Sequence, residues 1–343
     1  MCVCPSPRSR GTLSSEPDVT TSLTPEATTR SRWTRRRVLD FLGENGFIVI
    51  FVLWCLFLEL ATRRFATEGN LFTVLRQASI VSIVAIGETL VLLTGAMDVS
   101  LAAILGFCGI VTASLMTTAN VPLGLACLIG VGVGGAIGLI NGLVVTKIKV
   151  NPIIATLGMM SILTGLALMY TGGQSVYGPA LDSLAVLSSG GRLPVLIMFA
   201  LYGLFYFVLS RTLFGAHLYA VGGNHTAAWL SGLQVDRIRL AAFVLAGLLA
   251  GLGGVMQVAR LGAASPTMGD EFLFPILTAV ILGGVSLSGG KGRLFNVLIA
   301  SIFLVTITNG LVLLDTLVNA QRVVSGVILI VALSLDQLRQ RTR

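Results

Sequence analysis

Long apolar blocks constrain this chain more than any other feature of its sequence. A helix needs about 20 apolar residues to cross a hydrocarbon core of roughly 30 Å, and the blocks have about that length. Only 11% of the residues are charged and the mean hydropathy is +0.91, whereas a soluble domain carries about 25% charged residues. Backbone groups in lipid must be paired within the chain, so each block should be helical. The sequence therefore predicts an all-α polytopic membrane protein, since the short alternating segments of a β-barrel are not seen.

We expect about ten transmembrane helices. The third and fourth are separated only by the stretch from Asn120 to Pro122, and the second and third only by residues 95–98. At the second of these breaks, a re-entrant segment could replace a simple turn. The expected segments are 46–62, 72–94, 99–119, 121–146, 152–171, 193–210, 238–259, 272–288, 294–314 and 319–336.

The positions of Lys and Arg predict the orientation of the chain, because cytoplasmic loops carry an excess of them. With both termini in the cytoplasm, most of the 23 basic residues fall on the cytoplasmic side. Residues 1–37 are rich in Ser, Thr, Pro and Arg and should form a disordered cytoplasmic tail, and 38–343 the transmembrane domain. The net charge of +8 does not predict nucleic-acid binding, because the basic residues lie at the ends of apolar blocks.

Regularly spaced glycines predict tight helix packing. Within one apolar segment glycine recurs every fourth residue from Gly130 to Gly142, and Gly247 and Gly251 repeat this spacing in the seventh segment. Glycines four residues apart lie on one face of a helix, so a second helix can approach closely there.

The longest expected cytoplasmic loop, residues 211–239, contains signals for a short helix. Asn224 is a suitable N-cap, and Gly232 is a suitable stop. Such a helix could dock into a groove of a soluble partner, or it could lie among lipid headgroups, and both interpretations stay open on physical grounds. The candidate residues are Gly222, Gly223, Asn224, Thr226, Ala227, Ala228, Trp229, Ser231 and Gly232.

Several longer motifs follow one another along the chain. They are Leu93–Ser100, Asn151–Leu157, Gly222–Gly232, Ala259–Arg260 with Ser265–Thr267, and Leu282–Arg293. In this order they resemble the permease subunit of ribose-type ATP-binding cassette (ABC) sugar importers, a resemblance that covers nearly the whole chain from about residue 45.

The resemblance implies a transport subunit and not an enzyme, with no cofactor of its own. It would pair with a second permease subunit, identical or related, in the bacterial plasma (inner) membrane. Two ABC ATPase subunits would hydrolyse ATP, and a periplasmic or extracellular sugar-binding protein would deliver a sugar or small polyol. The ATPase would dock on the loop 211–239, and the binding protein near Arg260, Asp270 and Glu271.

We call residues 211–239 the coupling loop, and two of its positions depart from the pattern that this family usually shows. The family usually carries an acidic residue where Thr226 stands and often a basic one where Trp229 stands. We therefore expect a more apolar contact with the ATPase, made through Trp229.

A path for a hydroxyl-rich sugar needs hydrogen-bonding groups that face a cavity. Asp98 follows a predicted chain break, and broken helices mark binding regions in transporters. Asp98 could also cap the third segment, with Ser100 in its first turn. The buried Asn side chains could instead join helices. The candidates along the path are Glu88, Asp98, Ser100, Asn141, Asn151, Thr156 and Asn309.

A proton-coupled secondary transporter is the alternative function, because Glu59 and Glu88 are ionisable groups in apolar segments. An embedded enzyme or a metal site is not predicted. The two histidines, His217 and His225, both lie in the coupling loop. Leu287–Lys291 resembles the signature loop of an ABC ATPase, but the chain has no phosphate-binding G-x-x-x-x-G-K-[ST] motif, so we expect a short cytoplasmic turn there.

Overall fold

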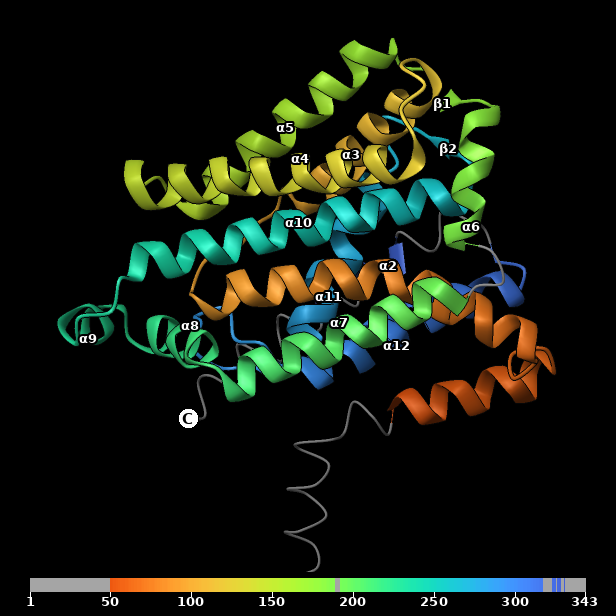
Figure 1. Ribbon diagram of the computed structural model, residues 1–343. Coiled ribbons are helices and arrows are strands. Elements are labelled where there is room, and N and C mark those ends of the chain that lie inside the picture. Colours follow the sequence, from red (N-terminus) through yellow and green to blue (C-terminus); the bar gives the residue numbers. More distant parts are fainter. Residues whose placement is uncertain (1–49, 189–191, 317–322, 325, 328–329, 331–343) are drawn as a thin grey trace, which may run out of the picture. The chain divides into compact units, whose positions relative to one another are not determined.

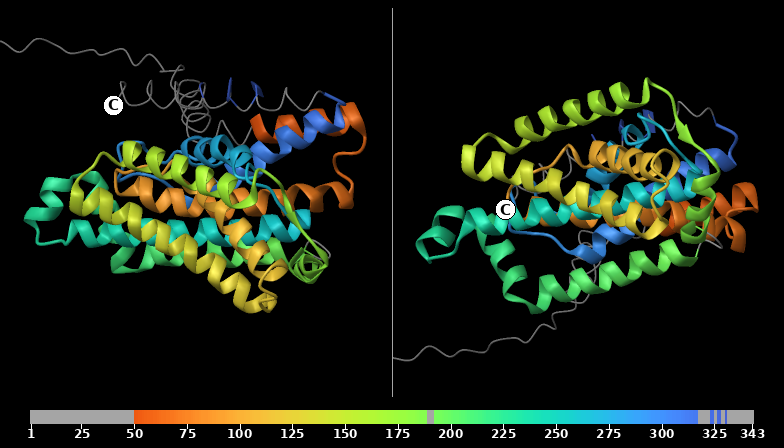
Figure 2. Two further views of the ribbon diagram at one scale, coloured as in Figure 1. Left: turned by 90° about the horizontal axis from the view of Figure 1, so that it is seen from above. Right: turned by 45° about the horizontal axis from the view of Figure 1, so that its top comes forward.

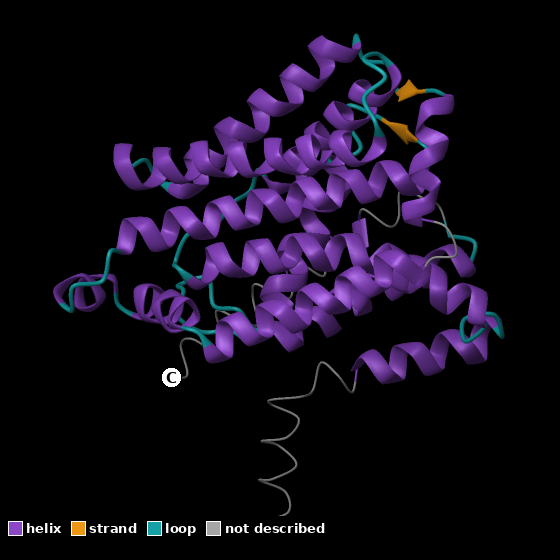
Figure 3. Cartoon of the chain, in the orientation of Figure 1, coloured by secondary structure: helices purple, strands orange, loops and turns teal. Residues whose placement is uncertain are grey.

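The computed structural model describes residues 50–188, 192–316, 323–324, 326–327 and 330, and these are mostly helical (Figure 3). The chain divides into two units, Met1–Ile50 and Phe51–Arg343. The account below concerns the second unit. The expected disordered tail, residues 1–37, lies outside the described residues.

Six of the described helices are long and apolar enough to cross a membrane. They are α2 (Glu68–Leu93), α4 (Leu123–Leu143) with its π-helical extension Val144–Ile148, α5 (Pro152–Thr171), α7 (Arg192–Arg211), α10 (Val235–Leu261) and α12 (Leu294–Leu313). Shorter elements are the helix Ile50–Thr62, α3 (Leu101–Thr117), the 3₁₀-helix Pro179–Leu184 with α6 (Ala185–Ser188), α8 (Leu213–Gly223), α9 (His225–Leu230), the 3₁₀-helix Asp270–Phe272 and α11 (Leu273–Leu282).

Ten crossings are not confirmed by these elements. In place of the expected segment 272–288, α11 has only 10 residues, about half of what a span needs. It ends where Gly284 adopts a φ of +81°, a left-handed conformation that stops a helix. The expected segment 319–336 lies mostly outside the described residues.

The weakest predicted boundary, between the third and fourth segments, is confirmed. Helix α3 ends at Thr117, and α4 begins after Pro122, which holds the N-cap position. Between them Asn120 has a φ of +50°, which interrupts the helix because residues other than glycine rarely adopt that conformation.

Helix α10 is central, with α4 on one side and α2 on the other, and it also packs on α3 (Figures 1 and 2). The contact with α4 confirms the expected glycine packing. A Cβ on Gly134 would overlap the carbonyl oxygen of Gly247, and a Cβ on Gly138 that of Phe243. The two backbones therefore touch, as small-residue faces allow.

The helices run between two ends that carry different elements (Figure 1). At one end lie α8 and α9, and we call it the α9 end. At the other end the strands β1 (Val176–Tyr177) and β2 (Ala263–Ala264) pair antiparallel, with Val176 opposite Ala264. We call this the β end.

Candidate functional site

The coupling loop forms two helices, α8 and α9, where the sequence predicts one. The N-cap prediction is confirmed, because the Ala227 N–H donates to Asn224 Oδ1 over 2.9 Å. The stop is confirmed as well, since Gly232 follows α9 with a φ of +83°. The signal for α8 is Thr212, whose Oγ1 accepts the Gly215 N–H and caps the helix.

Helix α9 exposes an apolar face. Trp229 is 65% exposed and its neighbour Leu230 is 72% exposed, while Ala228 is buried against the protein. Thr226 is exposed on the same short helix. Large exposed apolar side chains beside each other indicate a contact surface.

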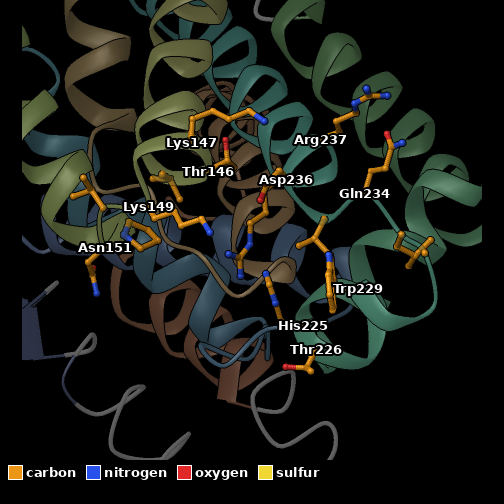
Figure 4. Close-up of a pocket in the computed structure, with 17 residues that line it drawn as sticks. Thr146, Lys147, Lys149, Asn151, His225, Thr226, Trp229, Gln234, Asp236 and Arg237 are labelled. Atoms are coloured by element: carbon orange, nitrogen blue, oxygen red, sulfur yellow. The ribbon is translucent and has the colours of Figure 1, made fainter.

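A groove of about 890 Å³ lies beside α9 (Figure 4). One wall is the elbow between α4 and α5, residues 145–152, and the other combines α9 with the start of α10. In Figure 4 the side chain of Lys149 points across the groove toward Asp236 and His225. Trp229 belongs to the second wall, so the groove continues the exposed apolar surface of α9.

The groove is strongly basic. Its lining holds four cationic side chains and the single carboxylate of Asp236. The surplus positive charge favours an acidic partner surface. The four cationic residues are Lys147, Lys149, Arg237 and Arg239.

Five of the seven path candidates converge in one buried cluster. At its centre, the carboxylate of Asp98 accepts the Ser100 backbone N–H over 2.9 Å. The Asn141 side-chain amide on α4 donates to Asp98 Oδ2 over 3.2 Å and to Ser100 Oγ over 2.8 Å. The capping prediction for Asp98 is wrong in detail, because Ser100 holds the N-cap position of α3, and Asp98 forms an Asx-type turn before it.

Glu88 and Thr156 pair the backbone groups of the break between α2 and α3. The Asp98 N–H lies 3.3 and 3.4 Å from the two carboxylate oxygens of Glu88, and the Val99 N–H donates to Thr156 Oγ1 over 3.2 Å. Buried N–H groups need such partners wherever the chain leaves regular helix. The cluster therefore joins the break to α2, α4 and α5.

The polar cluster, defined as Glu88, Asp98, Ser100, Asn141 and Thr156, is closed to solvent. None of its five members is more than 2% exposed. A sugar cannot touch these side chains in this conformation. Direct contact with a substrate would require the helices to separate at the break.

The other two path candidates lie elsewhere. Asn151 is exposed and caps α5, where its Oδ1 accepts the Ile153 N–H over 3.0 Å. Asn309 on α12 exchanges side-chain amide hydrogen bonds of 3.1 and 2.9 Å with Asn70 on α2. Asn309 is half-buried and joins two helices, which is the alternative role that the sequence left open for this Asn.

The expected binding-protein contacts gather at the β end. Asp270 and Glu271 are exposed, whereas Arg260 at the end of α10 is only partly exposed. Gln257, which is fully buried, donates from Nε2 to Glu271 Oε1 over 3.3 Å. This bond fixes one of the two exposed carboxylates to α10.

Sequence reasoning missed two side chains that tie the α9 end together. The Tyr219 hydroxyl on α8 donates to the Gly292 carbonyl over 3.0 Å, and burial raises the pKa of this phenol. Arg239 on α10 donates from Nη2 to the Thr94 carbonyl over 3.1 Å. Neither Tyr219 nor Arg239 stands out in the sequence, because both depend on distant backbone carbonyls.

Comparison with known proteins adds to this geometry. Residues 70–333 match the family described as "Branched-chain amino acid transport system / permease component". The chain belongs to this permease family. The match confirms the resemblance drawn from the motifs, and together with the long apolar helices it makes this permease a multi-pass membrane protein.

Similar proteins cover nearly all of this permease. The D-allose transport system permease protein of Escherichia coli (strain K12) is 36% identical over 295 residues, 85% of this chain and 90% of that protein. The ribose import permease protein of Bacillus subtilis (strain 168) is 36% identical over 305 residues, 88% and 94% of the two chains. The L-arabinose ABC transporter permease protein of Azospirillum brasilense is 33% identical over 331 residues, 94% and 96%. No solved structure matches the chain.

Proposed function

We propose that this permease is the membrane-spanning subunit of an ABC importer that moves a sugar or related small polyol across the bacterial plasma membrane. Partner ATPase subunits hydrolyse the ATP, and a second permease subunit and a sugar-binding protein complete the transporter. The α9 end faces the cytoplasm and the β end faces the binding protein. The similarity to the allose, ribose and arabinose permeases supports the substrate class.

One observation carries the proposal: the exposed helix α9 and the buried polar cluster lie at the same end of the helices. Glu88 is five residues from the end of α2, and Asn141 is two residues from the end of the α-helical part of α4, which continues as a π-helix to Ile148. At about 1.5 Å per residue, Glu88 lies within roughly 8 Å and Asn141 within roughly 11 Å of the end of its helical span. A partner that moves α9 can therefore act on the closed end of a path through the helices.

The ATPase partner docks on α9 and in the basic groove. Trp229 supplies the apolar contact, because it is the large side chain that α9 leaves exposed next to the groove. Lys149 and Arg237 supply the charge, so the facing ATPase surface carries carboxylates. Glu271 and Asp270 at the opposite end contact the binding protein.

Reconstitution tests this function. Proteoliposomes that hold this permease with its ATPase subunits and binding protein should take up D-ribose, D-allose or L-arabinose. Uptake should occur only when ATP is present on the side of the membrane where the ATPase subunits lie. Replacement of the Lys in the phosphate-binding loop of the ATPase should stop uptake. Uptake by the permease alone would refute the proposal.

A proton-coupled transporter is the second candidate, and the burial of Glu88 favours it. A buried carboxyl group in a membrane helix is a potential proton site. Glu59 fits this role poorly, because its Oε2 accepts the Ala66 N–H over 2.7 Å at an exposed turn. Uptake driven by a pH gradient without ATP or partners would support this second function.

A further inference from the structure

Three backbone segments touch one another at the C-terminal end of α8 with no side chain between them. They are the end of α8 at Gly222–Gly223, the end of α2 with the residue that follows it (Leu93–Gly95), and the turn Gly289–Gly290 between α11 and α12. The Gly290 N–H donates to the Leu93 carbonyl over 3.0 Å. We call these three segments the glycine junction.

Space at the junction admits only glycine at several positions. A Cβ on Gly222 would overlap the Leu93 carbonyl oxygen and the Gly290 nitrogen. A Cβ on Gly289 would lie 2.6 Å from the Gly95 nitrogen and 3.0 Å from the Gly222 Cα. Gly289 and Gly290 also have φ values of +83° and +69°, which glycine adopts without strain. The three backbones are therefore in van der Waals contact, and close-packed contacts of this kind transmit displacement.

The junction has α9 on one side and the polar cluster on the other. On the first side, Gly223 is followed directly by Asn224, the N-cap of α9. On the second side, Gly95 is three residues before Asp98 in the break between α2 and α3. The Arg239 guanidinium adds a hydrogen bond to the Thr94 carbonyl within the junction, and the Tyr219 hydroxyl adds one to the Gly292 carbonyl, two residues after Gly290.

We propose that the glycine junction transmits movement of α8 and α9 to the Asp98 break, with Gly222 as its central positioning residue. This proposal rests on the proposed function, because it assigns the route by which ATPase docking reaches the polar cluster. Packed elements switch between discrete arrangements and deform little. A junction of bare backbone is suited to such a switch, since no flexible side chain absorbs the displacement.

Two glycines in different parts of the chain provide a matched test. Gly222→Ala inserts a methyl group into the junction, whereas Gly203→Ala on α7 inserts one at an exposed position where nothing lies within 4 Å. Both variants are compared in the complete transporter in proteoliposomes, with D-ribose, D-allose and L-arabinose as probes. We expect Gly222→Ala to lower sugar uptake per ATP hydrolysed at least about tenfold while hydrolysis continues, and Gly203→Ala to stay within about twofold of the parent. Equal coupling in the two variants would overturn the proposal.

A second readout does not depend on the sugar. Met97→Cys is introduced into a chain whose native cysteines are replaced by Ser. The rate at which this cysteine reacts with a thiol reagent reports how accessible the break between α2 and α3 is. Binding of Mg-ATP to the complete transporter should change this rate at least about threefold in the parent and with Gly203→Ala, and not with Gly222→Ala. If Gly222→Ala shows the same ATP-dependent change in rate as the parent, the proposal is contradicted. A parent transporter whose rate does not change when ATP binds would contradict it as well.

A milder variant covers the case in which Gly222→Ala fails to assemble. Tyr219→Phe keeps the ring and removes only the hydroxyl that bonds the Gly292 carbonyl. We expect it to lower sugar uptake per ATP hydrolysed, or the ATP-dependent change in the reaction rate of Met97→Cys, about two- to fivefold. If both quantities equal those of the parent, the proposal is overturned. Failure of the proposed function would look different, because the parent transporter would then show no requirement for ATP or for the ATPase subunits.

Discussion

The side-chain amide of Asn141 on α4 donates to the Asp98 carboxylate over 3.2 Å, across 43 residues of sequence. The same amide reaches Ser100 Oγ over 2.8 Å. One residue on α4 thus joins both polar side chains of the break that separates α2 from α3. Because all three are buried, the bonds matter more than they would at a surface, where water could replace them.

Asn141→Ala should destabilise the permease and impair transport. It leaves the buried Asp98 carboxylate short of a donor, which costs about 1–3 kcal/mol. Thermal unfolding in detergent and sugar uptake measure the two effects. Asn309→Ala is the matched control, since it also removes a helix-joining amide pair, the one with Asn70. The control should lose stability and keep its uptake per assembled transporter, and an equal loss of uptake would argue against a special role of the polar cluster.

Trp229→Ala should weaken binding of the ATPase partner without affecting the fold. The side chain is 65% exposed, so its removal leaves no cavity. A Trp at the centre of an interface contributes about 2 kcal/mol or more, which corresponds to roughly 30-fold in affinity. Co-purification and titration of the ATPase measure this loss. Tyr206→Ala on α7, at a side chain of similar exposure, should bind the ATPase normally; equal binding by the two variants would place the docking surface elsewhere.

Reversal of charge in the groove should weaken the same association. Lys149→Glu replaces a cation that lines the groove, whereas Lys291→Glu changes an exposed Lys outside that lining. We expect Lys149→Glu to lower ATPase affinity at least about fivefold at low salt and less at high salt, because salt screens charges near a surface. If Lys149→Glu instead loses binding to vesicles of anionic lipid and keeps the ATPase, the groove faces the membrane surface.

Gly232→Pro should abolish transport while the protein remains inserted. The φ of +83° at this turn is closed to proline, whose ring fixes φ near −65°. Gly232→Ala should have a smaller effect and destabilise the left-handed conformation of the turn by about 1–2 kcal/mol. The added methyl group causes no clash, because nothing lies within 4 Å of it. Protease protection reports insertion, and sugar uptake reports coupling. Normal uptake with Gly232→Pro would remove this turn from the docking surface.

Glu88→Gln separates the two candidate functions. The amide retains a carbonyl oxygen that can accept the Asp98 N–H but cannot carry a transported proton. We expect uptake driven by ATP to persist within about threefold of the parent. Loss of uptake together with a pH-gradient requirement in the parent would instead favour the proton-coupled transporter.

Local features of the sequence determined much of this protein. Block length and hydropathy predicted the long helices, because membrane thickness sets how many apolar residues a span needs. The Asn224 cap, the Gly232 stop and the glycine face of α4 were predicted as well, since each depends on residues a few positions apart. The count of crossings was less secure, because α11 is short and buried and its hydropathy does not reveal its length.

Only the tertiary structure decided which distant residues meet. Residue type selected Glu88, Asp98, Ser100, Asn141 and Thr156 as candidates, but it selected Asn151 and Asn309 equally, and these lie elsewhere. The Gly289–Gly290 turn was predicted as a turn, with no sign that it touches Gly222. Such contacts depend on how each helix is rotated and shifted against its neighbours, and hydropathy along a single helix carries little of that information when the helix is apolar on all sides.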